Sequence, residues 1–234
     1  MQIFYVPGII GNACVMDENE SRHCVRVLRM SKGDKVTIVD GQGGFFEGII
    51  TDPDPSACRI RITDSTTGFE KRGYRLHMAV SPVKNQERFE WFIEKSVEFG
   101  IDEITPVICR FTEKQNVKTE RINNIIISAM KQSLKAYRPL LNEPVRFSEF
   151  MAGEHSGIKM IAHCNPGYAL KNIGQVYEKG MDALILIGPE GDFSREEIDM
   201  ALAGGFTGVS LGNSRLRTET AGIAACHSIY FINQ

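Results

Sequence analysis

The hydrophobic positions of the chain follow two different periods. Over about the first 70 residues the chain reads as short strands and turns, and residues 59–63 alternate strictly between isoleucine and Arg or Thr. A β-branched run at 36–40 ends in a glycine-rich turn at 41–44, and residues 45–50 resume the pattern, which predicts a hairpin. Short strands at this close spacing predict a small β-barrel.

After a polar turn at 65–73, strands and helices alternate, and this order predicts an α/β domain. The all-apolar runs at 158–162 and 183–187 are typical of strands that are buried on both faces of a parallel sheet. Gly100 is suited to end the helix that precedes it. We expect further strands at 76–80, 104–108 and 209–211, and helices at 86–99, 118–134, 195–203 and from about 218 onward.

The segment from Gly188 to Ser194 directly follows one of the buried strands. Ser194 and Glu197 have the spacing of a capping box, and Phe193 and Ile198 have the spacing of a hydrophobic staple. We therefore expect a rigid loop between the strand and a helix. It lies at the carboxyl end of a strand, where α/β proteins bind their ligands.

A second loop, residues 212–221, follows the last predicted strand. Thr218 or Thr220 is placed to cap the final helix. The inner face of that helix carries small residues, which permit close approach of another backbone.

The first loop differs from the known phosphate-binding motifs. Its Gly188-Pro189-Glu190-Gly191 segment matches neither GxGxxG nor GxxxxGK[ST]. Pro189 removes a backbone donor, and Glu190 places a carboxylate where a phosphate would lie. The pattern argues against dinucleotides and triphosphates and favours a neutral or cationic ligand held by main-chain groups. The alternative is an ordinary strand-to-helix turn.

Several charged residues in or beside the loops are candidates for chemistry. Arg215 and Arg217 either face solvent, or one of them contacts an anionic substrate while Glu219 orients it. Glu190 is either a solvated turn carboxylate or a group that accepts a proton or holds a ligand ammonium. His163 ends a predicted strand near both loops and is either a site residue or a core histidine.

The total charge excludes a uniformly basic surface for nucleic acid, because 27 Lys and Arg are opposed by 29 Asp and Glu. Basic residues nevertheless gather at 22–35 and at 110–138. Each stretch alone is typical of a solvated face, but together, beside a barrel-like module, they predict contact with RNA phosphates. The residues expected to make this contact are Arg22, His23, Arg26, Arg29, Lys131, Lys135 and Arg138.

Cysteine spacing and hydropathy indicate a cytoplasmic protein. The six cysteines form no CxxC pair and the five histidines do not cluster with them, so we expect reduced thiols and no metal site. The longest aliphatic run, at 183–187, is too short to cross a bilayer, and the first residues lack a signal-peptide pattern. We therefore expect no membrane association.

Five segments of the chain share the pattern of one known family, namely 188–197, 211–221, 23–34, 94–106 and 128–139. They resemble the RsmE family of small-subunit ribosomal RNA uridine-N3 methyltransferases, which belongs to the knotted SPOUT superfamily. The resemblance covers essentially the whole chain. The sequence departs from the family pattern at Asp192, where Gly is usual, and at Ser128, where Glu is common.

The resemblance implies a two-domain protein. Residues 1–72 would form a PUA-like β-barrel domain that helps to hold RNA. Residues 73–234 would form an α/β SPOUT methyltransferase domain with a deep trefoil knot, whose loops bind S-adenosyl-L-methionine as the cofactor. The family acts as a homodimer, with 16S ribosomal RNA of the small ribosomal subunit as its partner and without a metal.

The resemblance also implies the reaction, which is methylation of N3 of a specific uridine near the decoding site. An arginine would stabilise the uridine anion; we assign this role to Arg217, with Arg215 as second choice and Glu190 or Glu219 to orient it. The alternatives are a SPOUT ribose 2′-O-methyltransferase and a non-catalytic RNA-binding ribosome assembly factor. The residues expected to form the cofactor pocket are Ile187, Gly188, Pro189, Glu190, Gly191, Leu211, Gly212, Leu216 and His163.

Overall fold

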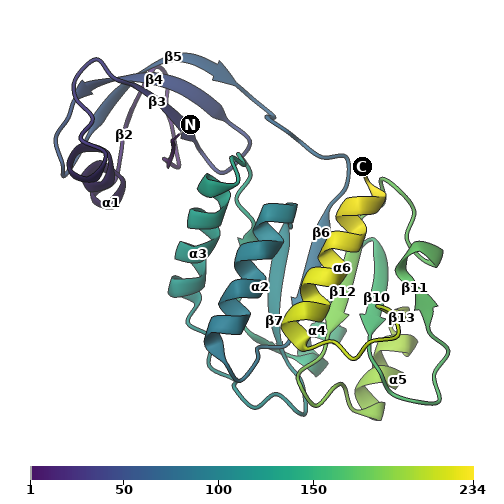
Figure 1. The fold of residues 1–234 in the computed structure, drawn as a ribbon. Helices are drawn as coiled ribbons and strands as arrows, with labels where there is room; N and C mark the ends of the chain where they lie inside the picture. Colours follow the sequence, from purple (N-terminus) through teal and green to yellow (C-terminus); the bar gives the residue numbers. More distant parts are fainter. Residues whose placement is uncertain (1) are drawn as a thin grey trace. The chain divides into compact units, whose positions relative to one another are not determined.

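The computed structural model describes residues 2–234, which form two compact units; the chain is coloured from its first to its last residue in Figure 1. The first unit contains the chain up to Lys71 together with Ile127–Arg138. The second contains Arg72–Ile126 and Pro139–Gln234. A single boundary between residues 72 and 73 therefore leaves out the return of residues 127–138 to the first unit.

Backbone hydrogen bonds attach this returning segment to the first unit. The amide of Gly43 donates to the carbonyl of Ala136 at 3.0 Å, and the amide of Arg138 donates to the carbonyl of Gly41 at 2.9 Å. These bonds join segments that are distant along the chain, so the local hydrophobic period could not indicate them.

The first unit is built on a five-stranded sheet with the strand order β1-β3-β4-β5-β2. β1 is parallel to β3, and the other neighbouring strands are antiparallel. Apolar side chains from both edge strands and from the central strands meet in one core, so the sheet wraps around it. The elements are β1 (Ile3–Tyr5), β2 (Ala13–Val15), α1 (Glu18–Arg22), the π-helix η1 (His23–Val27), β3 (Lys35–Val39), β4 (Phe45–Asp52) and β5 (Arg59–Thr66).

The second unit contains an eight-stranded sheet. Seven strands follow the order β11-β13-β10-β12-β6-β7-β8, and β9 pairs with the end of β7. All of these pairs are parallel. β12 is buried at all five positions, which explains its unbroken aliphatic run. The strands are β6 (Leu76–Val80), β7 (Glu103–Ile108), β8 (Leu140–Leu141), β9 (Val145–Arg146), β10 (Ile158–Ala162), β11 (Lys171–Asn172), β12 (Ala183–Ile187) and β13 (Thr207–Ser210).

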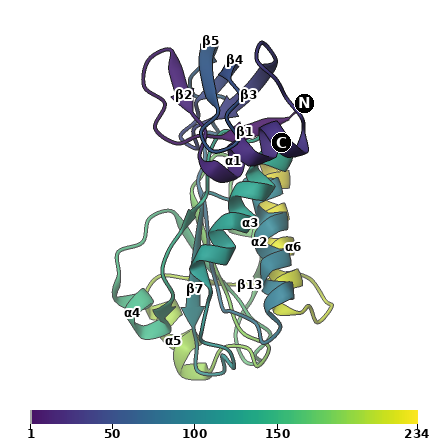
Figure 2. The ribbon, with the colours of Figure 1, turned by 90° about the vertical axis from the view of Figure 1, so that its left-hand side faces the viewer.

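Helices cover both faces of this sheet. α2 and α6 lie side by side on one face, and α4 and α5 lie on the other, as Figures 1 and 2 show. The small residues of the last helix do permit close approach, because a Cβ at Gly222 would lie 2.6 Å from a ring atom of Phe92 in α2. The helices are α2 (Gln86–Phe99), α3 (Thr119–Gln132), α4 (Phe147–Ala152), the 3-10 helix η2 (Ile173–Gln175), α5 (Arg195–Ala203) and α6 (Thr218–Ile232).

The predicted strands and helices agree with this structure to within a few residues at each end. Gly100 ends α2 in a left-handed conformation, with φ of 89°, as its position predicted. The prediction missed β1, β2, β8, β9, β11, α1 and α4, which have two to six residues each. Elements of this length do not complete enough of a hydrophobic period to be recognised. In the part of the chain that the structure describes, no helix has both the length and the apolar surface that crossing a membrane requires.

We predict that one of the six cysteines reacts in the native protein. Cys164 is exposed, whereas the other five thiols are free and buried. Burial raises the pKa of Cys14 to about 11 and the pKa values of Cys24 and Cys226 to about 12, so few thiolates are present near pH 8. Titration with a thiol reagent should therefore modify one thiol in buffer and all six in denaturant. Rapid modification of three or more native thiols would contradict the buried positions.

Candidate active site

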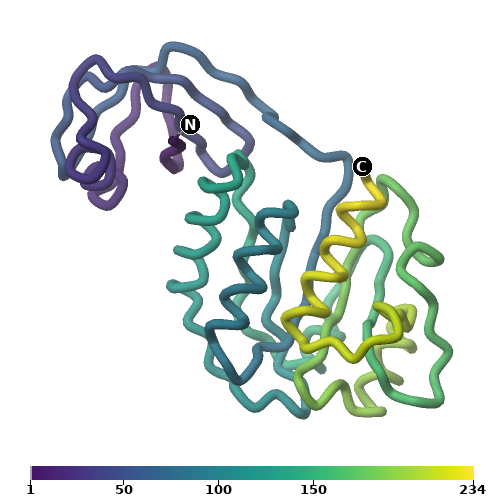
Figure 3. Tube along the Cα trace, in the orientation of Figure 1, coloured from purple at the N-terminus to yellow at the C-terminus, as the bar shows by residue number. Residues whose placement is uncertain are grey.

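The carboxyl ends of the central strands lie at one edge of the sheet in the second unit. Ala162 of β10 is in register with Ile187 of β12 and with Val209 of β13, and Ile187 is also in register with Val80 of β6. The loops that follow these strands therefore begin side by side. Figure 3 traces the last of them, which runs from β13 along this edge to the start of α6.

A cavity of about 860 Å³ lies among these loops. Its volume is in the range of sites for small molecules. The loops after β10, β12 and β13 all contribute to its wall, so the structure brings the two predicted loops together. All nine residues predicted for the cofactor pocket line it, namely Ile187, Gly188, Pro189, Glu190, Gly191, Leu211, Gly212, Leu216 and His163.

The start of α5 holds the loop after β12 in place. The hydroxyl of Ser194 accepts the amide hydrogen bond of Glu197 at 3.2 Å, and the carboxylate of Glu197 accepts that of Ser194 at 2.9 Å. The predicted capping box is therefore confirmed. The second carboxylate oxygen of Glu197 accepts the amide hydrogen bond of Arg110 at 2.8 Å, so this residue also anchors the segment after β7.

Asp192 links the loop after β12 to the loop after β10. Its φ of 65° is a left-handed conformation, which Gly adopts freely and Asp tolerates. Its Oδ2 atom accepts hydrogen bonds from the amide of Cys164 at 2.8 Å and from the side-chain amide of Asn165 at 3.1 Å. The backbone conformation shows why Gly suits this position, and the carboxylate adds a connection that Gly cannot make.

Thr218 joins the two predicted loops. The residue that caps α6 is Arg217, which makes no side-chain capping bond, so the prediction that Thr218 or Thr220 caps this helix is wrong. The hydroxyl of Thr218 instead donates to the carbonyl of Gly188 at 2.9 Å, in a buried position. A buried carbonyl at the end of a strand needs a donor, and Thr218 supplies it.

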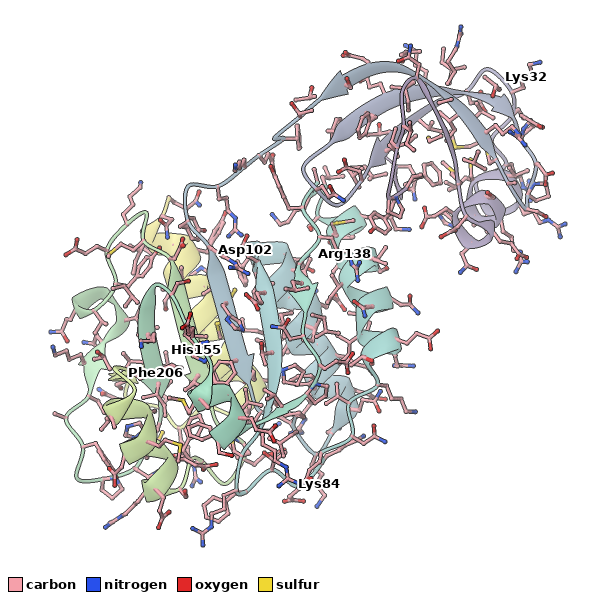
Figure 4. The ribbon with its side chains drawn as sticks, turned by 180° about the vertical axis from the view of Figure 1, so that it is seen from behind. Lys32, Lys84, Asp102, Arg138, His155 and Phe206 are labelled. Carbon is pink, nitrogen blue, oxygen red and sulfur yellow. The ribbon has the colours of Figure 1, made fainter. Side chains whose placement is uncertain are left out.

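The two carboxylates that were expected to orient Arg217 have other partners. Glu190 accepts a hydrogen bond from the amide of Lys84 at 2.9 Å, and Figure 4 shows Lys84 at the edge of the sheet where the loops gather. Glu219 is buried and lies 3.7 Å from the guanidinium of Arg88. Neither carboxylate therefore orients Arg217 directly as predicted, because each is already held by a group from the segment after β6.

Arg215 and Arg217 lie on the wall between two spaces. Arg215 lines the cavity and also an adjoining groove, whereas Arg217 lines only the groove. Within residues 2–234 neither guanidinium forms an ion pair. Both groups are therefore available to an anionic ligand.

His163 lies in the cavity wall as a buried side chain. Its Nδ1 atom accepts the amide hydrogen bond of Asn165 at 3.3 Å, and its ring meets that of Tyr168 edge-on at 5.2 Å between centroids. Burial lowers the pKa of His163, although the carboxylate of Asp192 acts in the opposite direction. Among the described residues, no three His, Cys, Asp or Glu side chains are grouped as ligands for a metal ion.

The seven basic residues predicted to contact RNA all lie in the first unit. Lys131 of α3 forms an ion pair with Glu20 of α1, which connects the two basic stretches. Arg22 forms an ion pair with Glu18 one turn earlier in α1. The structure thus brings together two groups of cations that lie far apart in the sequence.

The sequence analysis missed Phe111 and Asn165, which also line the cavity. A Cβ at Gly191 would lie 2.9 Å from the Cβ of Phe111, so the glycine makes room for this side chain. The side-chain amide of Asn165 donates to the carbonyl of Phe193 at 3.0 Å. Both residues follow the carboxyl ends of predicted strands, and that position was the signal that could have identified them.

The fold and the site define a parallel α/β protein with a ligand cavity at the carboxyl edge of its sheet. A family model described as RNA methyltransferase domain matches residues 70–230, and another described as RNA methyltransferase PUA domain matches residues 17–63. The first match covers more than half of the chain. The chain belongs to this family of RNA methyltransferases, which confirms the resemblance drawn from its loops.

Individual relatives agree with this assignment. The structure is similar to a crystal structure of a probable rRNA-methyltransferase from Porphyromonas gingivalis, with 38% identity, a TM-score of 0.93 and coverage of 100% of this chain and 98% of the other. It is also similar to a ribosomal RNA small subunit methyltransferase E from Neisseria gonorrhoeae bound to S-adenosyl methionine, with 26% identity, a TM-score of 0.90 and coverage of 100% and 98%. A ribosomal RNA small subunit methyltransferase E from Buchnera aphidicola is 29% identical over 92% of this chain and 89% of its own.

We predict that Asp192→Ala lowers the free energy of unfolding by about 2–3 kcal/mol, because it removes two hydrogen bonds between loops and places Ala in a left-handed conformation. Asp192→Asn keeps an acceptor and tolerates the same φ, so it should lose less. Urea unfolding of both variants measures the difference. Equal losses would show that the side chain does not connect the loops.

Proposed function

We propose that this protein uses S-adenosyl-L-methionine to methylate N3 of a specific uridine near the decoding site of 16S ribosomal RNA in the small ribosomal subunit. The observation that carries the proposal is the union of the two predicted loops around one cavity, with the hydroxyl of Thr218 bonded to the carbonyl of Gly188 at 2.9 Å. Membership of the RNA methyltransferase family and the relative with bound S-adenosyl methionine support the same activity.

The residues around the cavity suit this cofactor. Gly188 and Gly212 line the cavity without a side chain, so a ligand can approach the main chain closely there. The charged groups around the same space are balanced, which suits a ligand that carries charges of both signs. They are the carboxylates of Glu190, Asp192 and Glu196 and the guanidinium groups of Arg110, Arg195 and Arg215. Phe111 adds an aromatic side chain to the wall, which suits a ligand that carries a flat ring.

When bound, S-adenosylmethionine would supply an electrophilic methyl group, and N3 of the uridine would lose its proton to solvent in order to accept it. The protein's own residues position the reactants and stabilise charge. Arg217, with Arg215 in second place, stabilises the negative charge that develops on the uracil oxygens. Because N3 lies on the Watson–Crick edge, the base must be unpaired or flipped out to react.

We also propose a fold and an assembly for the two units. The first unit acts as a PUA-like β-barrel whose basic residues contact RNA phosphates, and the second is a SPOUT domain with a trefoil knot. The position of the last helix supports the knot, because β13 lies on one side of β10 while α6 packs against β6 and β12 on the other. The chain therefore crosses the strand ends before it enters α6. The protein acts as a cytoplasmic homodimer.

The reaction is tested with small ribosomal subunits purified from cells that lack this protein. Incubation with the protein and labelled S-adenosylmethionine, followed by nucleoside analysis, should yield 3-methyluridine. A 2′-O-methylated nucleoside would instead identify a ribose methyltransferase. Absence of transfer, together with retained binding to the subunit, would identify a non-catalytic assembly factor.

We predict that Arg217→Ala lowers the rate of methylation about 10²- to 10³-fold, which is the usual loss when one donor to a developing anion is removed. Arg217→Lys keeps the charge but not the planar guanidinium, so it should retain part of the activity. The affinity for S-adenosylmethionine, measured by calorimetry, should stay within about twofold, because Arg217 does not line the cavity. Unchanged turnover in Arg217→Ala would show that Arg217 does not stabilise the charge that develops on the uracil oxygens.

A further inference from the structure

A second hollow adjoins the cavity on the other side of the wall that carries Arg215. It is an open groove of about 590 Å³ between α2 and the loop that leads into α6. It shares Arg215 and Leu216 with the cavity, so these two residues form a common wall. The remaining lining residues are Glu87, Arg88, Trp91, Arg217, Glu219 and Thr220.

Trp91 gives this groove a large aromatic surface. It is the single tryptophan of the chain and is 46% exposed, whereas the next two residues of α2, Phe92 and Ile93, are fully buried. Exposed aromatic side chains of this size are the platforms on which unpaired nucleic-acid bases stack.

The charge of the groove complements RNA. Three guanidinium groups and two carboxylates line it, so positive groups outnumber negative ones by one. Of the carboxylates, Glu219 is buried against Arg88 at 3.7 Å, and Glu87 is the other. Because Arg215 and Arg217 form no ion pair within residues 2–234, the groove presents two unneutralised cations beside the indole. A nucleotide could use both the indole and the arginines. Its base would stack on Trp91, and its phosphate and the carbonyl oxygens of its base would lie near the guanidinium groups.

We propose that this groove is the acceptor site and that the uracil to be methylated stacks on Trp91, with its N3 edge toward the wall formed by Arg215 and Leu216. This inference rests on the proposed function, and it adds the location of the base and a residue that selects for an unpaired one. It also accounts for Arg217, which can act on the base only from the side of the wall on which it lies.

The single tryptophan permits a direct binding test, because RNA does not fluoresce at the emission wavelength of indole. A 16S ribosomal RNA fragment that contains the decoding site should quench the emission of the wild-type protein in a saturable manner. The same fragment with the target uridine replaced by an abasic site should quench markedly less. Equal quenching by both fragments, or none by either, would overturn the proposal.

Kinetics provide the second test. Trp91→Leu should raise the KM for unmethylated small subunits about 10- to 100-fold, which is the usual effect of losing one base-stacking contact, while Trp91→Phe should stay within a few-fold of the wild type. Calorimetry should show unchanged affinity for S-adenosylmethionine in both. Met200→Ala, which removes a similarly exposed side chain (44%) from α5, is the matched control and should behave as the wild type.

The outcomes separate this inference from the function on which it rests. Normal methylation by both the wild type and Trp91→Leu would overturn the groove assignment and leave the function intact. Failure of the wild type to methylate would contradict the function. Sedimentation of Trp91→Leu as a smaller species than the wild type would assign the groove to contact with a second copy of the chain, which would also overturn the proposal.

Discussion

The candidate active site depends on one buried hydrogen bond, from the hydroxyl of Thr218 to the carbonyl of Gly188. The bond fastens the first turn of α6 to the loop that leaves β12, and the cavity lies beside this junction. Without the bond, a carbonyl at the end of a central strand would be buried and unsatisfied, which costs about 1–3 kcal/mol. The same contact therefore stabilises the fold and holds the two site loops together.

Around this junction, other polar residues hold the neighbouring loops in position. Glu197 anchors the segment after β7, and Asp192 holds the loop after β10, so three loops are fixed by carboxylates that accept backbone hydrogen bonds. Glu219 is buried against Arg88. As a result, the arginines on the wall between the cavity and the groove remain available for a ligand, and this is the distribution of charge that transfer to an anionic RNA requires.

The first unit gathers basic residues from two distant stretches of a chain whose formal net charge is −2. The basic residues of α1 and η1 belong to the same compact unit as the end of α3, and the ion pair of Lys131 with Glu20 connects them. Cations that lie far apart in the sequence thus gather in one unit. A family model for the PUA domain of RNA methyltransferases matches residues 17–63 of this unit.

The sequence by itself determined the long strands, the main helices, the capping box at Ser194 and two of the loops that line the cavity, because each depends on a period or spacing of a few neighbouring positions. Tertiary structure alone decided that Thr218 bonds to a residue 30 positions earlier and that Asp192 bonds to one 28 positions earlier. It also decided that Glu219 faces Arg88, and that residues 127–138 return to the first unit. These pairings depend on the order of strands in the sheet, and no local pattern records that order.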